Sequence, residues 1–527
     1  MKNNLFQLLL LIFLPVFVFS QSTSKVPKTR KYGYTPALIR GPYLQVATSN
    51  SIIVRWRTDE NDVSFVRYGT DVDNLNLLAG NSHRTREHLV TLTNLKPQTK
   101  YYYMVEGVRD TLQWSNDNYF VTLPIVGTQD KYRIGIFGDC GNNSINQRDS
   151  RDQFEKYLGN NVLNAWILLG DNAYSFGKDE EYQANFFNIY KDGLLKKSPL
   201  FPAPGNHDYH DERYSADHAQ ESKEVAYYQN FSMPTKGEAG GLPSHTQAFY
   251  SYDIGNIHFL SLDSHGEEDR TLSRLFDTLG RQVRWVKEDL EANKNKDWVV
   301  VYWHHPPYSM GSHNSDTETQ MRKIRENFIG ILERYGVDLI LCGHSHSYER
   351  SKLMQGHFGL QKSFDPAKHL LSNSSGKFDG SENSCPYIKD DSNKGTVYVV
   401  SGSAGALDHN QATFPHDALP FADVSVGGAS IFEVEGNRLD FKWISTDGKI
   451  RDKFTIMKNV NKKTVINIKK GKTAVLKASY VGEYNWKGLN KKSRSIEVKS
   501  TAAVTTYTVN DPNSCLQDIF EVHVSKN

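Results

Sequence analysis

Five short stretches of this chain place a residue that can bind a metal ion directly after an apolar run. In AWILLGDNAY, residues 165–174, five apolar residues predict a buried strand that ends at Gly170. Asp171 then stands at the carboxyl end of the strand, where open α/β sheets form ligand sites, and Tyr174 follows three residues later. Their oxygens are hard ligands that suit a highly charged metal ion such as ferric iron. Taken alone, Gly-Asp-Asn also fits a simple turn in which Asp171 bonds its own backbone.

Four further stretches share this design, and each ends an apolar run with polar side chains. They are RIGIFGDCG at 133–141, PLFPAPGNHD at 199–208, WVVVYWHHPP at 298–307 and VDLILCGHSHSYER at 337–350. They present Asp139, Asn206, His207, Asp208, His304, His305, His344 and His346. A hydrolase with two metal ions about 3.5–4 Å apart needs such a set, because the ions must share a bridging ligand and hold a hydroxide. One motif of this kind is weak evidence, whereas five at strand ends indicate a two-metal hydrolytic site.

The elements that must position these residues change in character along the chain. Residues 37–124 hold short alternating strands, at 51–57, 64–68, 99–108 and 119–123, which predict an N-terminal β-sandwich of fibronectin or immunoglobulin type. Residues 131–457 alternate apolar strands with amphipathic helices, the clearest at 281–293 and 320–335. They predict an α/β domain, a mixed β sandwich flanked by helices. Within it, residues 351–394 predict a long surface excursion, and residues 459–527 predict a small Ig-like all-β module.

The first 20 residues predict a secretory signal peptide. Lys2 supplies the positive charge, residues 5–19 supply the apolar run, and Ser20 is small enough to precede a cleavage site. An uncleaved anchor is the alternative, but the run is short for a membrane span and contains Pro15. With residues 21–36 as a linker, we expect a secreted, periplasmic or cell-surface protein without a membrane span after cleavage.

The four cysteines fall into two kinds. Cys140 and Cys342 each end an apolar strand and are predicted to be small buried residues. Cys385 and Cys515 lie in polar segments, where an exported protein could oxidise them. Four cysteines allow three pairings, and the sequence does not choose among them.

The charge of the chain is close to balanced. A formal net charge of +2 gives no electrostatic case for nucleic acid as the main partner. Lysines gather in residues 459–527, so this module could contact a surface or an acidic polymer, although a solvated sheet face is the simpler interpretation.

The ordered set GDCG, GDNAY, GNHD, VYWH and GHSHSYER resembles the metallophosphoesterases and, more closely, the purple acid phosphatases. The tyrosine of GDNAY and the SYER that follows the histidine pair separate this group from the general calcineurin-like phosphoesterases. The N-terminal sandwich is also similar to that group. The resemblance covers about residues 38–457 and leaves the C-terminal module outside.

This resemblance implies a binuclear centre of ferric iron and a divalent ion of iron, zinc or manganese. The ferric ion would be held by Asp139, Asp171, Tyr174 and His346. The divalent ion would be held by Asp171, Asn206, His304 and His344, with Asp171 as the bridge. His207 and His313 would lie beyond the metals and bind phosphate or protonate the leaving group. His305 competes with its neighbour for the role of ligand, but the spacing from Val301 favours His304.

The resemblance implies a secreted acid phosphatase that hydrolyses small phosphate monoesters by in-line attack of a metal-bound hydroxide. A phosphodiesterase or nucleotidase on the same two-metal site is one alternative. A non-catalytic surface or adhesive protein with a retired phosphoesterase domain is another. Against the latter, every expected ligand position holds a residue of the right type.

Overall fold

The computed structural model describes residues 35–211, 213, 219–268 and 273–525. The predicted signal peptide, residues 1–20, and residues 21–34 of the predicted linker lie outside them. Within the described residues, no helix is both long and apolar enough to cross a membrane.

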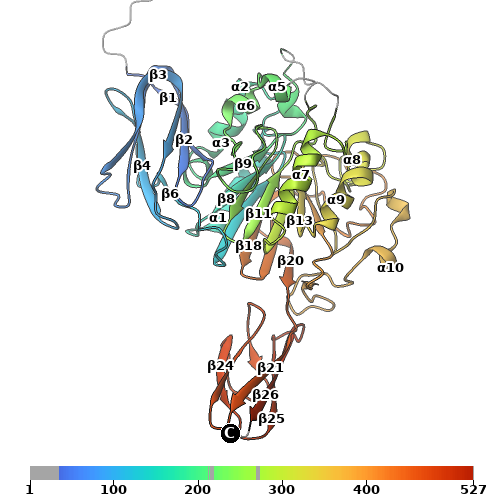
Figure 1. Cartoon of the computed structure of the whole chain (residues 1–527). Coiled ribbons are helices and arrows are strands. Elements are labelled where there is room, and N and C mark those ends of the chain that lie inside the picture. The colour runs from blue at the N-terminus through green and yellow to red at the C-terminus, as the bar shows by residue number, and fades with distance from the viewer. Residues whose placement is uncertain (1–34, 212, 214–218, 269–272, 526–527) are drawn as a thin grey trace, which may run out of the picture. The chain divides into compact units, whose positions relative to one another are not determined.

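The N-terminal part is a β domain, as predicted (Figure 1). Its strands are β1 Leu38–Gln45, β2 Ile52–Gly69, β3 Leu77–Leu92, β4 Lys100–Glu106, β5 Thr111–Gln113 and β6 Tyr119–Val121. The expectation of separate strands at 51–57 and 64–68 is wrong, because both belong to the 18-residue β2. Around Asp62 the pairing with β3 shifts register, which breaks the alternation of buried and exposed side chains without ending the strand. Trp56, Val66 and Tyr103 form part of the buried core of this domain.

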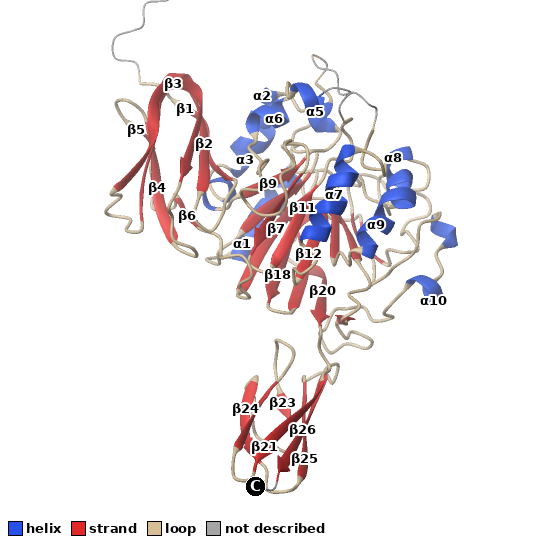
Figure 2. Ribbon diagram, in the orientation of Figure 1, coloured by secondary structure: helices blue, strands red, loops and turns tan. Residues whose placement is uncertain are grey.

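Two mixed sheets form the central part, with helices along their flanks (Figure 2). The first contains β7 Lys131–Phe137, β8 Ala165–Leu169, β9 Leu200–Ala203, β15 Tyr387–Lys389, β18 Gly428–Glu435, β19 Arg438–Ser445 and β20 Ile450–Lys458. The second contains β10 Tyr250–Ile254, β11 Ile257–Ser261, β12 Trp298–Tyr302, β13 Leu339–Cys342, β14 Tyr348–Arg350, β16 Val397–Ser401 and β17 Phe421–Asp423. Strands β7, β8 and β9 run parallel, and so do β11, β12, β13 and β16.

The two sheets pack face to face through aromatic side chains. Phe201 of β9 stacks on Tyr252 of β10 with ring centroids 3.9 Å apart, and Phe259 of β11 lies against Phe432 of β18. Because β8, β12 and β13 are buried along their whole length, their sequences read as unbroken apolar runs. A single parallel pairing of Gln45 with Leu200 also joins β1 to β9, so the first sheet continues into the N-terminal strands.

Helices lie around these sheets (Figure 2). They are α1 Ile145–Leu158, α2 Asp179–Glu181, α3 Asn188–Tyr190, α4 Leu194–Lys197, α5 Ala219–Ser222, α6 Ala226–Asn230, α7 Arg281–Ala292, α8 Thr319–Lys323, α9 Ile329–Arg334 and α10 Pro366–His369. Helix α1 packs against β18 and β19, whereas α4 packs against β1 and β6 of the N-terminal part. The predicted helix at 281–293 is confirmed as α7, which buries Val283, Val286 and Leu290. The predicted helix at 320–335 is interrupted by a π-helical segment, Ile324–Phe328, between α8 and α9.

The C-terminal residues form an all-β unit with its own core. Its strands are β21 Lys463–Lys469, β22 Thr473–Lys477, β23 Asn485–Trp486, β24 Ser495–Lys499, β25 Val504–Asn510 and β26 Gln517–Ser525. Leu476, Trp486 and Val522 pack in that core. The immunoglobulin type of this unit stays a prediction.

The expectation of a surface excursion at 351–394 is wrong in part, because β15 of this segment pairs with β20 and buries Tyr387 and Lys389. A disulfide joins Cys385, which precedes β15, to Cys515 of the C-terminal unit, with Cα atoms 5.3 Å apart. It selects one of the three pairings that the sequence allowed. Cys140 and Cys342 are unpaired and buried, as predicted.

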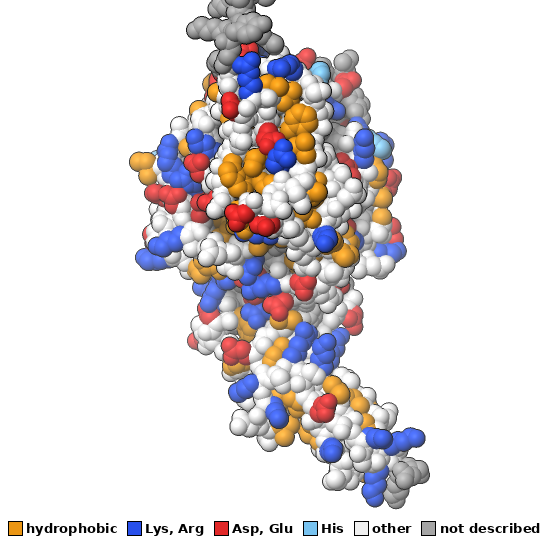
Figure 3. All heavy atoms as spheres, turned by 90° about the vertical axis from the view of Figure 1, so that its left-hand side faces the viewer, with side chains coloured by type: hydrophobic (Ala, Val, Ile, Leu, Met, Phe, Trp, Pro, Cys, Tyr) orange, Lys and Arg blue, Asp and Glu red, His pale blue; other side chains and the backbone are white. Residues whose placement is uncertain are grey.

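Charged side chains of both signs are interspersed over the face seen in Figure 3. This pattern accords with the net charge of +2. Lys469, Lys472 and Lys477 of the C-terminal unit are exposed. Whether they contact a polymer stays a prediction.

Candidate metal centre

The expected metal ligands follow neighbouring strands at a short, regular distance. Asp139 and Asp171 each stand two residues beyond the ends of β7 and β8, and His304 and His344 stand two residues beyond β12 and β13. Asp139, Asp171 and His344 have φ values of 56°, 51° and 66°. Such left-handed backbone is uncommon outside glycine, costs about 1–2 kcal/mol per residue and is concentrated at functional sites.

Glycines let these strand ends approach one another closely. A Cβ atom on Gly205 would lie 2.2 Å from Oδ1 of Asp171, and one on Gly170 would lie 2.5 Å from Nδ1 of His304. No side chain fits at such distances, which gives the glycines of GNHD and GDNAY a steric reason.

The first group of donors brings together Asp139, Tyr174 and His346. The Tyr174 hydroxyl donates to Oδ1 of Asp139 at 2.9 Å and lies 3.3 Å from Nε2 of His346. The backbone N–H of His344 donates to both oxygens of Asp139, at 3.1 and 2.9 Å. Three residues expected to hold ferric iron therefore meet through their ligand atoms.

The second group brings together Asp171, Asn206, His304 and His344. Nε2 of His304 lies 3.3 Å from Oδ2 of Asp171, 3.0 Å from Oδ1 of Asn206 and 3.2 Å from Nδ1 of His344. Nδ1 of His304 lies 2.8 Å from the Leu169 carbonyl. Since a carbonyl only accepts, Nδ1 donates to it, which fixes the ring and turns Nε2 towards the group. Two nitrogen and two oxygen donors fit a divalent ion of iron, zinc or manganese.

Burial and charge set which ligands of the metal-free cluster carry protons. Asp139 and Asp171 are 0% and 2% exposed. Burial raises the pKa of Asp139, whereas for Asp171 the nearby His304 outweighs burial and lowers the pKa. Burial lowers the pKa of His344 to about 3 and that of His346 to about 4. Burial lowers the pKa of His304 as well, but the charges of Asp171 and Asp139 outweigh it and raise that pKa to about 9. Cations that bind here would displace protons from Asp139 and His304, so metal binding should strengthen as pH rises.

His207 and His313 lie beside these groups and are more exposed. The backbone N–H of His207 donates to Oδ1 of Asp171 at 2.8 Å, and its Nδ1 donates to the Ser175 carbonyl at 2.7 Å. The His313 ring stacks on that of His344, with centroids 3.7 Å apart. Their side chains are 29% and 32% exposed. Both therefore stand between the buried donors and solvent, where residues that contact the substrate are expected.

His305 points elsewhere. Its Nδ1 lies 2.8 Å from the Ser264 hydroxyl, and burial lowers its pKa well below the usual range. The geometry brings His304, not His305, to Asp171, which agrees with the spacing argument from Val301.

Two further carboxylates lie near the cluster, Asp208, which the GNHD motif presents, and Glu318, which no motif includes. Asp208 is buried, and its Oδ2 accepts hydrogen bonds from the Gly205 N–H at 2.7 Å and the Asn172 side chain at 2.9 Å. It thereby ties the GNHD loop to the GDNAY loop. Glu318 accepts from Nδ1 of His313 at 2.8 Å and lies 3.1 Å from Nε2 of His344. Asp208 belongs to a recognised motif, but Glu318 lies in a polar segment that follows no apolar run, so no sequence signal marks it.

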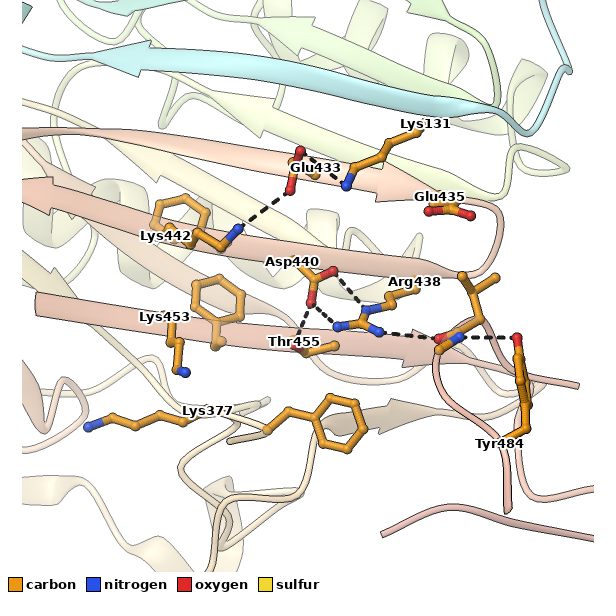
Figure 4. A pocket seen from close by; sticks show the side chains of 15 residues that line it. Lys131, Lys377, Glu433, Glu435, Arg438, Asp440, Lys442, Lys453, Thr455 and Tyr484 are labelled. Carbon is orange, nitrogen blue, oxygen red and sulfur yellow. Dashed lines mark hydrogen bonds and ion pairs between the residues drawn. The ribbon is translucent and has the colours of Figure 1, made fainter. Parts of the chain in front are cut away.

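A cavity of about 520 Å³ lies away from the cluster, between β18–β20 and the residues around Tyr484 (Figure 4). Its charged side chains largely pair with one another. Arg438 lies 2.7 Å from Asp440, and Lys131 and Lys442 lie 3.3 and 3.4 Å from Glu433. None of the expected metal ligands lines this cavity, so it is separate from the candidate metal centre.

The chain matches two family models, and together they span most of the first two structural parts. The model for calcineurin-like phosphoesterases matches residues 132–348, and the model for the N-terminal domain of purple acid phosphatases matches residues 39–122. These segments contain the strand-end motifs and the N-terminal strands.

Relatives and solved structures point the same way. The human protein named acid phosphatase type 7 is 27% identical over 385 residues, which cover 69% of this chain and 75% of that protein. Purple acid phosphatase 15 of Arabidopsis thaliana is 29% identical over 290 residues, or 50% of this chain and 49% of its own. The solved structure of the yellow lupin purple acid phosphatase PPD1 superposes with a TM-score of 0.61 at 18% identity. The superposition covers 80% of this chain and 74% of the lupin chain, and it shows that the two chains share a fold.

The strand-end donors, the N-terminal β domain, the two family models and the relatives agree. The chain therefore belongs to the purple acid phosphatase family within the calcineurin-like phosphoesterases, and it is a hydrolase of the acid phosphatase type.

Proposed function

We propose that this protein is an exported acid phosphatase that hydrolyses small phosphate monoesters at a binuclear metal centre. The observation that carries the proposal is the meeting of seven donor side chains, from five strand ends, in two groups that are joined where the His344 N–H donates to Asp139. Such a set gives each of two cations several ligands and leaves one carboxylate to bridge them.

The proposed ligands are those that the family resemblance implies. Ferric iron would be held by Asp139, Asp171, Tyr174 and His346. The divalent ion would be held by Asp171, Asn206, His304 and His344. When bound, the two cations supply Lewis acidity that neutralises phosphoryl oxygens and lowers the pKa of water.

The two exposed histidines would handle the substrate. Nδ1 of His207 is committed to the Ser175 carbonyl and Nδ1 of His313 to Glu318, so each ring keeps Nε2 for another partner. From there an imidazole can donate a hydrogen bond to a phosphoryl oxygen, or a proton to the departing alkoxide. The acid catalyst would then be a side chain of the protein, and the substrate would need no acidic group of its own.

The disulfide supports the exported location. Disulfides persist in oxidising compartments and are rare in the cytosol, and Cys385–Cys515 joins two segments 130 residues apart. The predicted signal peptide is the second argument for export.

The test compares rates on p-nitrophenyl phosphate and bis(p-nitrophenyl) phosphate for the wild type, Asp171→Asn and the exposed control Asp73→Asn. We expect preference for the monoester, near-complete loss of activity and metal in Asp171→Asn, and no change in Asp73→Asn. Faster hydrolysis of the diester would favour the phosphodiesterase alternative. A metal-loaded wild type that cleaves neither ester would favour the retired domain.

A further inference from the structure

Glu318 connects two histidines to which the proposed function gives different tasks. Its Oε1 lies 2.8 Å from Nδ1 of His313, and its Oε2 lies 3.1 Å from Nε2 of His344. The carboxylate is therefore shared between a residue that would contact the substrate and one that would hold the divalent ion.

The position of Glu318 is itself fixed by the backbone. It stands immediately before α8, where its N–H donates to the Asn314 carbonyl at 3.0 Å. Its Oε1 also accepts from the Asn314 N–H at 3.2 Å. Glu318 thus closes the loop that carries His313, and its carboxylate has little freedom to turn away.

The bond to His344 determines which ring nitrogen can act as a ligand. A carboxylate accepts, so Nε2 of His344 carries the proton and Nδ1 keeps a lone pair. Nδ1 is the nitrogen that faces His304, 3.2 Å away. In metal sites a carboxylate placed behind a histidine fixes its tautomer and orientation, and its loss typically weakens metal binding by about 10–100-fold.

The bond to His313 likewise determines which nitrogen of that ring can face the substrate. With Nδ1 donating to Glu318, Nε2 of His313 is left to face the substrate. The two rings stack with their centroids 3.7 Å apart, so one carboxylate holds both at a set distance from each other. A displacement of Glu318 would move both rings.

We propose that Glu318 is a positioning residue that aligns the divalent-metal ligand His344 and the substrate-facing His313 at once. This inference rests on the proposed function and adds to it a link between metal binding and substrate handling. Loss of Glu318 should weaken binding of the divalent ion and also leave a rate defect that excess metal cannot repair.

The experiment uses the full chain, stripped of metal and then titrated with Zn²⁺ in competition with a chromophoric chelator. The variants are Glu318→Ala, which loses both bonds, and Glu318→Gln, whose single acceptor oxygen can serve only one histidine. His313→Ala removes the substrate-facing ring alone. Glu326→Gln is the matched control, because it changes an exposed glutamate in the following helical segment.

We expect Glu318→Ala to bind the divalent ion about 10–100-fold more weakly. At saturating metal its kcat should fall about as far as that of His313→Ala, and adding His313→Ala to it should cost little more. His313→Ala should keep normal Zn²⁺ affinity, Glu318→Gln should be intermediate, and Glu326→Gln should match the wild type.

Unchanged Zn²⁺ affinity in both Glu318 variants would overturn the proposal. A kcat restored fully by excess metal would also overturn it, because His313 would then not depend on Glu318. If Glu318→Ala fails to fold, the same comparisons apply to Glu318→Gln. A wild type that neither binds Zn²⁺ nor hydrolyses p-nitrophenyl phosphate would instead refute the proposed function.

Discussion

Replacing Tyr174 by phenylalanine should separate the colour of this protein from its catalysis. The substitution keeps the ring, whose centroid lies 4.5 Å from that of the His207 ring, and removes only the hydroxyl. That hydroxyl donates to Asp139 and lies beside His346, whereas the second group of donors is formed without it. A phenolate bound to ferric iron should give a charge-transfer band in the visible, as the family resemblance implies, and the variant should lose it.

The expected losses of stability and of kcat in Tyr174→Phe follow from the contacts that the hydroxyl makes. Without metal, the variant loses one hydrogen bond to a buried carboxylate, worth about 1.5–3 kcal/mol of unfolding free energy. Asp139 keeps the two contacts from the His344 N–H, which limits the damage. Because His207 and His313 are untouched, kcat should fall by less than about tenfold, or about 1.4 kcal/mol in the barrier.

The protonation of Tyr174 adds a pH dependence to iron binding. Burial, followed by the charge of Asp139, raises the pKa of Tyr174 above its usual value, so the metal-free protein holds a neutral phenol. Binding as phenolate must release that proton, and this proton release should make iron binding weaken as pH falls. In Tyr174→Phe, this contribution to the pH dependence of iron affinity should be absent.

The assay is a visible spectrum, an iron content and a rate on p-nitrophenyl phosphate, all from the same sample of each protein. An iron-loaded wild type without the band, or a variant that keeps it, would show that Tyr174 is not a ligand. A colourless variant with no residual activity would refute the separation of the two roles.

Four other predictions follow from particular contacts. Gly205→Ala should lose metal and activity and should also lower the free energy of unfolding, because its Cβ would lie 2.2 Å from Oδ1 and 2.3 Å from the backbone nitrogen of Asp171; a fully active, metal-loaded variant would refute the steric argument. Cys385→Ser with Cys515→Ser opens a bridge between residues 130 apart and should destabilise the chain by up to about 5 kcal/mol in denaturant unfolding; an unchanged midpoint would contradict this. A chain ending at Lys458, with Cys385→Ser, should still hydrolyse an aryl phosphate if residues 459–527 are an independent module; a soluble, metal-loaded but inactive product would refute that domain boundary. Burial lowers the pKa of His258, but its bonds to Asp253 and Asp289 outweigh burial and raise it. Its stabilisation is thus complete below the unfolded pKa of about 6.5 and fades as pH rises through the folded pKa, so the unfolding deficit of His258→Asn should shrink at alkaline pH; a pH-independent deficit would show that the charge does not contribute.

The sequence predicted the strand ends well because burial makes them easy to recognise. Strands such as β8 and β12 are covered on both faces, so they read as unbroken apolar runs, and the polar residue that follows each is conspicuous. The carboxyl ends of parallel strands in facing sheets then bring Asp171 and His304 together without any further signal.

The rest depended on contacts that no local pattern records. Strand β2 continues past its polar residues 59–62 because pairing to β3 shifts register there, which a periodicity of two cannot anticipate. The choice of Cys385 and Cys515 as partners depends on how two distant segments pack. Glu318 matters only because two histidines from other segments turn towards it.

The most direct test of the central claim is a titration of the metal-free protein with iron and zinc, with activity on p-nitrophenyl phosphate measured at each step. If two cations share Asp171, activity should saturate at two metal ions per chain in the wild type and stay near zero in Asp171→Asn. Full activity in the presence of a strong chelator, or saturation at one metal ion per chain, would contradict the binuclear centre.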